Sequence, residues 1–268
     1  MGKDEVESFS FDRMAALYDA TRTVDAQCLK GALDFLVAAY PPAQFREAVY
    51  PGIGTGRIAI PLAQRGYRIT GLDISPNMLD ILAQRLRDLQ PDLPVSFRTG
   101  DATTLPFSDG SFDMAIAVHL FYFIPDWRRA MRELLRTVRK DGPIVLMHTG
   151  HGAEVPLVNE RYEAFCVVEG CAWRFPGARG SSDVLEYAAT LGCRVAKVSG
   201  RWQWVSRISL ERALADIRSR AYSFTSVTSD SLHARAVAML ESELADRFGS
   251  LSMEVKVPNE IWFAVLTR

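Results

Sequence analysis

Short apolar runs alternate with longer amphipathic segments through the middle of this chain. Strands are expected at 48–50, 67–72, 95–98, 112–118 and 144–148, with helices at 57–64, 76–89 and 126–138. The run at 112–118 is almost wholly apolar, which is typical of a strand covered on both faces of its sheet. Alternating elements of this length predict an α/β fold with a doubly wound, mostly parallel sheet.

The pattern of apolar and polar residues differs in the regions before and after this central part of the chain. Apolar residues recur at helical spacing over 11–18 and 28–40, before the first strand. After residue 148 we expect helices at 155–169, 182–191, 210–221 and 232–248, and strands at 193–205 and 261–267. We find no repeat or linker, so we predict one domain over 1–268. Its parts are N-terminal helices (1–44), a ligand-binding core (45–148), lid or acceptor insertions (149–192 and 206–250) and the last strands (193–205 and 259–268).

Composition narrows the class of partner. The 268 residues are 48% hydrophobic and 24% charged, as in an average soluble globular protein. The formal net charge is −1, so no overall field attracts nucleic acid or an anionic membrane, and a small-molecule partner is favoured. The N-terminus lacks the apolar core of a signal peptide, and the longest nearly apolar stretch, 114–125, is too short to span a bilayer.

The cysteines also bear on the compartment. They lie at 28, 166, 171 and 193 and form no C-x-x-C pair, so we expect buried free thiols. Free thiols are typical of a reducing compartment, and we therefore expect a cytoplasmic protein without membrane insertion.

A glycine-rich turn directly follows the first expected strand. Gly52, Gly54 and Gly56 allow the backbone to approach a ligand closely, and the helix after them favours an anionic group. Dehydrogenases place similar turns after a first strand, but they use G-x-G-x-x-G, whereas Arg57 stands here at the last glycine position. A nicotinamide-dependent oxidoreductase is therefore disfavoured but stays an alternative.

Two aspartates end the next two expected strands. Asp73 follows Gly52 by about 20 residues, a position that suits a carboxylate accepting from ribose hydroxyls. Asp101 ends the third strand on the same rim, where it could accept from an exocyclic adenine amine. Each also has a purely structural interpretation: Asp73 as a helix-capping residue, and Asp101 as a loop residue that binds backbone donors.

Together these motifs resemble the broad family of S-adenosylmethionine (SAM)-dependent methyltransferases that includes the ubiquinone/menaquinone C-methylases (methyltransferase type 11). The resemblance covers about 45–148 and rests on PGIGTGRIAIPLAQRGYRITGLDISPNML, GDATTLPFSDGSFDMAIAVHLFYFIPDW and ELLRTVRKDGPIVL. The segment FDRMAALYDA also resembles the tyrosine-containing stretch that often precedes the first strand in this family. The resemblance implies a seven-stranded, Rossmann-like class I fold with a helical lid, SAM as cofactor and S-adenosylhomocysteine (SAH) as product.

The resemblance also implies residues for the cofactor site. It places Gly52 and Gly54 at the methionine portion of SAM, Asp73 at the ribose, Ile74 and Met78 against the adenine, Asp101 and Ala102 at its edge, Tyr18 over the cofactor and His119 beneath the sulfonium. Tyr18 can equally be an aromatic residue that packs a helix onto the sheet.

One position departs from the family. An acidic residue usually stands two places before the first glycine and helps to organise the amino end of SAM, but this chain has Tyr50 followed by Pro51. The departure keeps open a second hypothesis, a SAM-binding homologue that regulates or runs another reaction instead of methylating.

The chemistry needs few catalytic groups. Methyl transfer from a sulfonium is an in-line displacement, so alignment and exclusion of water supply much of the catalysis. His119 is the best-placed candidate for a general base, with a cofactor-shell histidine as the alternative. His148 and His151 lack a suitably spaced acid, so we predict no metal. We expect a monomer or homodimer that acts on a small molecule. The chain has no Asn-Pro-Pro catalytic motif, which disfavours methylation of nucleic acid, and no motif indicates which atom of the acceptor is methylated.

Overall fold

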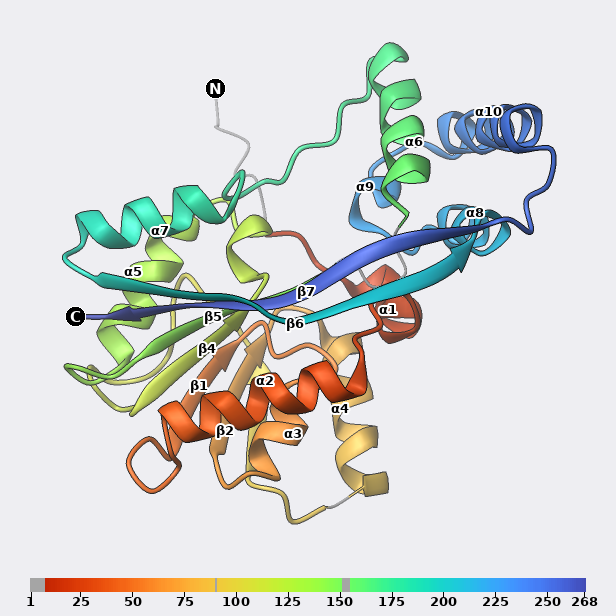
Figure 1. Ribbon diagram of the computed structural model, residues 1–268. Helices are drawn as coiled ribbons and strands as arrows, with labels where there is room; N and C mark the ends of the chain where they lie inside the picture. Colours follow the sequence, from red (N-terminus) through yellow and green to blue (C-terminus); the bar gives the residue numbers. More distant parts are fainter. Residues whose placement is uncertain (1–7, 90, 151–154) are drawn as a thin grey trace, which may run out of the picture.

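The computed structural model describes residues 8–89, 91–150 and 155–268, and its centre is one seven-stranded sheet. The strands are β1 (Glu47–Pro51), β2 (Arg68–Asp73), β3 (Val95–Thr99), β4 (Met114–Val118), β5 (Ile144–Thr149), β6 (Arg194–Ser209) and β7 (Glu254–Thr267). They lie in the order β3-β2-β1-β4-β5-β7-β6, and β7 runs antiparallel to both of its neighbours while the first five strands pair in parallel (Figure 1). The predicted α/β fold with a mostly parallel, doubly wound sheet is confirmed.

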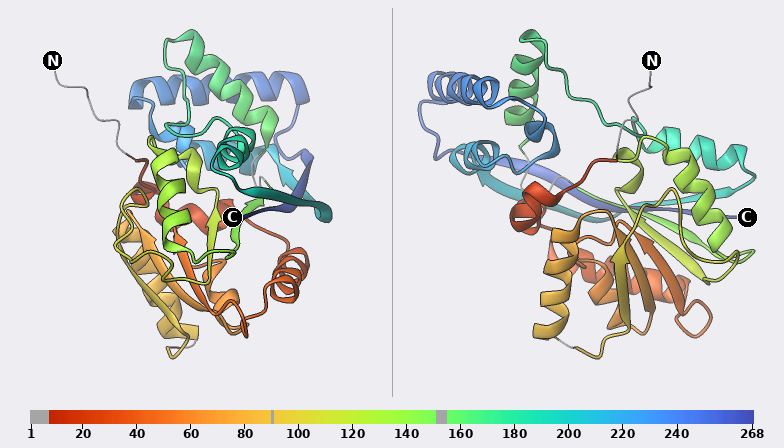
Figure 2. Two further views of the ribbon diagram at one scale, coloured as in Figure 1. Left: turned by 90° about the vertical axis from the view of Figure 1, so that its left-hand side faces the viewer. Right: turned by 180° about the vertical axis from the view of Figure 1, so that it is seen from behind.

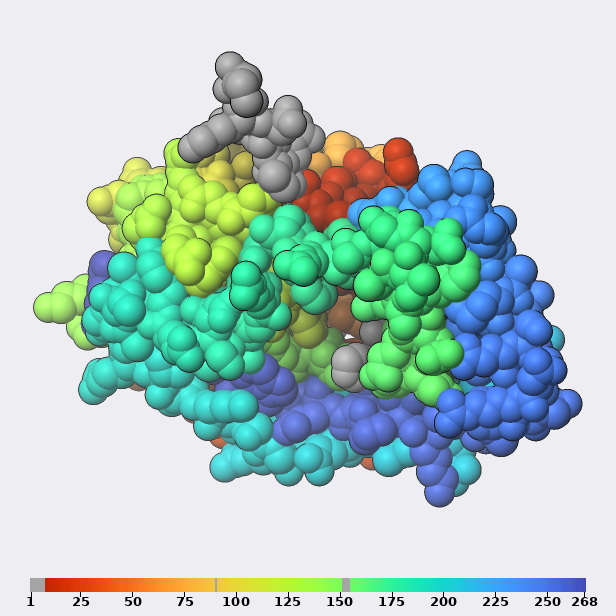
Figure 3. All heavy atoms as spheres, turned by 90° about the horizontal axis from the view of Figure 1, so that it is seen from above, coloured from red at the N-terminus to blue at the C-terminus, as the bar shows by residue number. Residues whose placement is uncertain are grey.

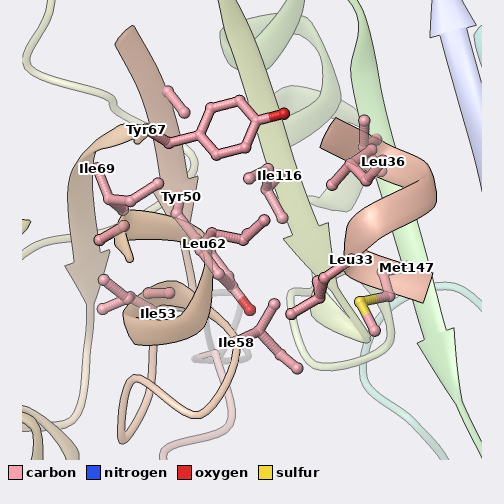
Figure 4. Close-up of a cluster of buried hydrophobic side chains, with 14 of the residues drawn as sticks. Leu33, Leu36, Tyr50, Ile53, Ile58, Leu62, Tyr67, Ile69, Ile116 and Met147 are labelled. Atoms are coloured by element: carbon pink, nitrogen blue, oxygen red, sulfur yellow. The ribbon is translucent and has the colours of Figure 1, made fainter. Parts of the chain in front are cut away.

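Helices cover both faces of the sheet. One face carries α2 (Ala26–Ala39), α3 (Ala59–Ala63) and α4 (Pro76–Leu89), and the other carries α5 (Trp127–Thr137) and α7 (Ser181–Thr190) (Figure 1). Successive residues of β1 divide between the two cores: Ala48 and Tyr50 join the first, and Val49 joins the second. Figure 4 shows Tyr50 in the first core, among side chains that include Leu33 of α2 and Leu62 of α3. The period of two along a buried strand thus assigns each side chain to a layer.

A second group of helices lies at the far end of a long β6–β7 hairpin. It consists of α6 (Pro156–Val168), α8 (Leu210–Arg218), α9 (Ser223–Ser226) and α10 (Asp230–Phe248), which share one hydrophobic cluster with the tips of both strands (Figure 2). We call this group the helical lobe. Between the lobe and the sheet lie the 3-10 helix η1 (Asp12–Met14) and α1 (Ala15–Thr21) at one end of the chain. A further 3-10 helix, η2 (Leu120–Tyr122), follows β4.

The structure differs from the prediction in parts of the region after residue 148. The strands predicted at 193–205 and 261–267 are longer, because β6 and β7 continue their pairing as a hairpin beyond the sheet. Residues 182–191 were assigned to a lid, but α7 buries Val184 and Ala188 in the core shared with α5. That part of the prediction was wrong, because its apolar face packs against the sheet rather than over a cavity.

No helix within residues 8–89, 91–150 and 155–268 is both long and apolar enough to cross a bilayer.

Candidate active site

A pocket lies at the carboxyl ends of β1, β2, β3 and β4, the usual place for ligands in an open α/β sheet. All nine residues that the sequence placed around a cofactor line it: Tyr18, Gly52, Gly54, Asp73, Ile74, Met78, Asp101, Ala102 and His119. They come from separate segments of the chain, and the fold brings them to one cavity.

The glycine turn is held to the end of β2 by backbone bonds. The N–H groups of Gly52 and Ile53 both donate to the carbonyl oxygen of Leu72, at 2.7 and 3.0 Å. Gly52 and Gly54 have φ values of +70° and +55°, which glycine adopts without the steric cost of a Cβ. A Cβ at Gly52 would stand 2.9 Å from Leu120, whereas one at Gly54 would meet nothing nearer than 3.9 Å. The turn therefore leaves open space above Gly54, on the pocket side.

Asp73 connects β2 to this turn. Its Oδ2 accepts from the N–H of Gly54 at 2.8 Å, and its Oδ1 accepts from the N–H of Ser75 at 2.9 Å. Burial raises the pKa of Asp73, against the lowering effect of the Ser75 and Gly54 N–H groups, and the nearby charge of Asp12 raises it further. Two carboxylate oxygens have about four acceptor positions, so Asp73 can still accept from ligand hydroxyls.

Apolar side chains and one acid form the next part of the pocket. Met78 and Ala102 are buried, and Ile74 lies beside them after β2. Asp101 is exposed at the rim, and its Oδ1 accepts from the N–H of Thr103 at 2.8 Å. Asp101 therefore lines the pocket and also makes the local turn that the structural interpretation anticipated.

Tyr18 covers the pocket from α1. Its ring makes an edge contact with Phe11 at 5.4 Å, and the guanidinium groups of Arg22 and Arg57 lie 4.5 and 5.9 Å from its centroid. Tyr18 thus lines the pocket and packs its helix at the same time, and two cations stand over its ring.

Tyr50 occupies the position of the family's acidic residue. It does not line the pocket: its side chain is 2% exposed and belongs to the core between the sheet and α2 (Figure 4). Burial raises the pKa of its hydroxyl, and the neighbouring Tyr18 acts in the same direction, so Tyr50 is uncharged at neutral pH. The substitution removes a negative charge here without filling the cavity.

His119 has a left-handed backbone conformation, with φ at 50°, just after β4. Its Nε2 accepts from the backbone N–H of Thr149 at 3.0 Å and lies 3.1 Å from the Thr149 hydroxyl. A backbone N–H only donates, so the lone pair of neutral His119 is on Nε2 and its ring proton is on Nδ1. This geometry favours His119 as a hydrogen-bond donor and does not favour the general-base hypothesis.

A second histidine lies beside the first. His148 stacks on Trp262 with ring centroids 3.8 Å apart, and its Nδ1 is 3.3 Å from the Tyr122 hydroxyl. Burial lowers the pKa of His148 to about 3, helped by His119 and Lys197, so it is neutral near pH 7. His151 lies outside the described residues, and the described part of the chain holds no cluster of three metal-ligating side chains.

The sequence missed most of the aromatic wall of the pocket. Phe9, Phe11 and Phe123 line it and touch one another at centroid distances of 4.8 to 5.7 Å. The pair Phe9 and Phe11 just ahead of a helix was a usable signal, because the two aromatic rings lie close enough in the chain to contact each other.

Comparison with known proteins identifies the domain. Residues 49–146 match a protein family described as a methyltransferase domain. The chain contains a class I SAM-dependent methyltransferase domain. SAM is the cofactor of this class, and the domain includes the glycine turn, Asp73, Asp101 and His119.

Named relatives share this domain rather than their full lengths. The demethylmenaquinone methyltransferase of Thermotoga maritima is 33% identical over 144 residues, which cover 51% of this chain and 58% of that protein. The phosphatidylethanolamine N-methyltransferase of Cereibacter sphaeroides is 30% identical over 111 residues, covering 41% and 54%. The chain therefore spans little more than half the length of these relatives.

A solved structure is similar in fold over most of this chain. The YcgJ protein of Bacillus subtilis superimposes with a TM-score of 0.59 over 89% of this chain and 99% of that one, at 16% identity. At such an identity the likeness concerns the fold alone.

Proposed function

We propose that this protein transfers the methyl group of SAM to a small-molecule acceptor. The observation that carries the proposal is the convergence of nine residues, predicted from sequence, on one pocket at the strand ends. The match of residues 49–146 to a methyltransferase domain also supports it. The proposal covers the whole chain, including the helical lobe, to which the domain match does not extend.

The residues of the pocket have distinct tasks under this proposal. Asp73 accepts from the ribose hydroxyls while it keeps the glycine turn in place through Gly54. SAM, held at the glycine turn and Asp73, would supply an activated methyl group on its sulfonium and would leave the site as SAH. His119 donates through Nδ1, and the aromatic wall excludes water from the reacting atoms.

The remaining segments bear on the acceptor. The helical lobe and the segment between α6 and α7 border a cavity next to the cofactor pocket, and we propose that they choose the acceptor, as a lid does. The two named relatives carry names with different acceptors, a demethylmenaquinone and a phosphatidylethanolamine, so the names assign none to this chain. We propose a monomer or homodimer without a nucleic-acid partner.

We further propose a reducing, cytoplasmic location. The observation that supports it is that all four cysteines are free thiols, with Cys166 and Cys193 buried.

Calorimetric titration with SAM, SAH and NAD tests the cofactor. We expect micromolar binding of SAM and SAH and none of NAD, followed by SAH release when acceptor mixtures are added. Binding of NAD with no binding of SAM would reject the proposal in favour of an oxidoreductase. SAM binding with no SAH release from any metabolite extract would favour the non-methylating homologue that Tyr50 suggested.

A further inference from the structure

A second cavity of about 360 Å³ adjoins the cofactor pocket. The two share Phe11, Tyr18, His119 and Phe123, so a molecule in the second cavity stands next to whatever fills the first. Seen from above, the molecule is hollowed between α6, the segment before α7 and β7 (Figure 3). If the proposed function is right, this cavity is the place for the methyl acceptor.

Part of the cavity wall is aromatic. Tyr122 and Phe123 come from the segment after β4, and Phe175 packs against both rings at 5.5 and 5.4 Å. Phe11 makes an edge contact with Phe123 at 4.8 Å. An apolar or aromatic body fits such a wall.

The rest of the wall is basic. Arg22, Arg57 and Arg179 line the cavity and come from three segments: the end of α1, the glycine turn and the stretch before α7. Arg22 is anchored through Nη1, which donates to the Thr21 hydroxyl at 2.9 Å and to the Ala221 carbonyl at 3.0 Å. Arg57 is anchored in turn, since its Nη1 donates to the carbonyl oxygen of Arg22. These contacts hold two guanidinium groups in place with further N–H groups still available.

None of these three arginines forms an ion pair with an acid anywhere in the described part of the chain, and no described lining residue of the cavity is acidic. Arg22 and Arg57 are half-buried, where a positive charge without an ion pair is costly. Asp216 of α8 is near enough for the charge of Arg22 to act on it, but its ion pair is with Arg212. SAM adds a further net positive charge, since its sulfonium and ammonium outweigh its one carboxylate. That carboxylate can satisfy one arginine and leaves the others unpaired.

Tyr50 adds to this excess of positive charge. With Tyr50 in place of the family's acid, the methionine end of the site has lost a negative charge while Arg57 stands beside it. Asp73 and Asp101 lie in the cofactor pocket and not in the second cavity, so the excess of positive charge is in the second cavity, where a second anion would balance it.

We infer that the acceptor is an anion, with a carboxylate or phosphate group bound by Arg22 and Arg179 and an apolar body against the aromatic wall. The inference rests on the proposed function only in naming the ligand an acceptor. The anion site itself is a property of the arginines. Guanidinium groups suit both anions, because their planar N–H pairs match carboxylate and phosphate oxygens.

The test uses three probes and the full chain loaded with SAH. Titration calorimetry is run with 3-phenylpropanoate, its uncharged amide and phenyl phosphate. We expect at least one of the two anions to bind, and the amide to bind at least about tenfold more weakly, as the loss of a charge-assisted hydrogen bond predicts. The stronger of the two anions distinguishes a carboxylate acceptor from a phosphate acceptor.

Variants locate the site. Arg179→Gln should weaken anion binding about tenfold without changing SAH affinity, because the Arg179 side chain is exposed and makes no bond among the described residues. Arg22→Gln should also weaken anion binding, and Arg22→Lys should restore part of the anion affinity, which a merely structural role would not require. Arg174→Gln is the matched control, an exposed arginine of the same segment that does not line the cavity.

An amide that binds as tightly as the stronger of the two anions would overturn the inference, as would wild-type anion affinity in both Arg179→Gln and Arg22→Gln. Failure of both anions to bind more tightly than about 1 mM would overturn it as well. The same titrations without SAH separate the two proposals. Anion binding that depends on the arginines, in a protein that binds neither SAM nor SAH, would keep the anion site and reject the proposed function.

Discussion

Asp73 and Gly54 are joined by a hydrogen bond of 2.8 Å, from the backbone N–H of the glycine to Oδ2 of the carboxylate. Through this bond the end of β2 fixes the turn that follows β1, the neighbouring strand. The same side chain is the one that the sequence assigned to the ribose. The carboxylate therefore shapes the pocket before any ligand arrives, and it contributes an acceptor to the pocket once shaped.

Asp73→Ala should weaken SAM binding by about 2–3 kcal/mol, because two charge-assisted hydrogen bonds to the ribose are lost. It should also lower the melting temperature, since Gly54 and Ser75 lose their acceptor. Calorimetry and thermal unfolding measure the two effects. Asp80→Ala is the control, an exposed aspartate on the adjoining helix α4. Unchanged SAM affinity in Asp73→Ala would show that the cofactor lies elsewhere.

Two glycines of the turn should respond differently to alanine. A Cβ at Gly56 would stand 2.3 Å from Leu82, so Gly56→Ala should lower the free energy of unfolding by roughly 1–3 kcal/mol through overpacking, beyond the cost of its positive φ. A Cβ at Gly54 meets no close neighbour and projects into the pocket, so Gly54→Ala should mainly weaken SAH binding. Thermal unfolding without ligand, followed by SAH titration, separates the two. A larger loss of stability in Gly54→Ala would contradict the assignment.

The Rossmann-like core was predictable because its signals are local. Helix α4 spans Pro76–Leu89, the range that the sequence predicted. Ser75 caps it, accepting from the N–H of Met78 at 3.2 Å. The strands of the core are likewise marked by apolar runs and the glycine turn next to them, so residues adjacent in the sequence are enough to predict where each strand lies.

The later region was less predictable because its signals are not local. The first half of β7 alternates charged and apolar residues around Pro258, and it becomes a strand by pairing with β6 in a hairpin that leaves the sheet. The arginines at 22, 57 and 179 are equally far apart in the sequence. Only the packing of the helical lobe against α1 and the segment before α7 brings them to one cavity.

His119→Ala should reduce SAM affinity and turnover by similar factors. The reason is that Nε2 already accepts from the Thr149 N–H, which leaves neutral His119 with its proton on Nδ1 as a donor. Long-range ¹H–¹⁵N NMR of the imidazole can check this tautomer directly. A protonated Nε2, or a loss of turnover far larger than the loss of affinity, would restore the general-base hypothesis.

The pKa of His148 predicts a specific loss of stability in acid. Burial lowers its folded-state pKa to about 3, whereas the unfolded chain has the ordinary value of 6.5. Above pH 6.5 both states are neutral and the group contributes nothing. As the pH falls from 6.5 toward 3, only the unfolded state takes up the proton, so stability falls with decreasing pH. At pH 5 the loss from this one group should be about 2 kcal/mol.

His148→Phe isolates that contribution. The variant keeps an aromatic ring against Trp262 and removes the titrating group, although Tyr122 loses its partner. The lost hydrogen bond should cost the same at both pH values, because burial raises the pKa of Tyr122 to about 12. Urea unfolding at pH 7 and pH 5 should therefore show a pH-dependent loss about 2 kcal/mol smaller in the variant than in the wild type. Equal losses in the two proteins would mean that His148 is charged in the folded state at pH 5.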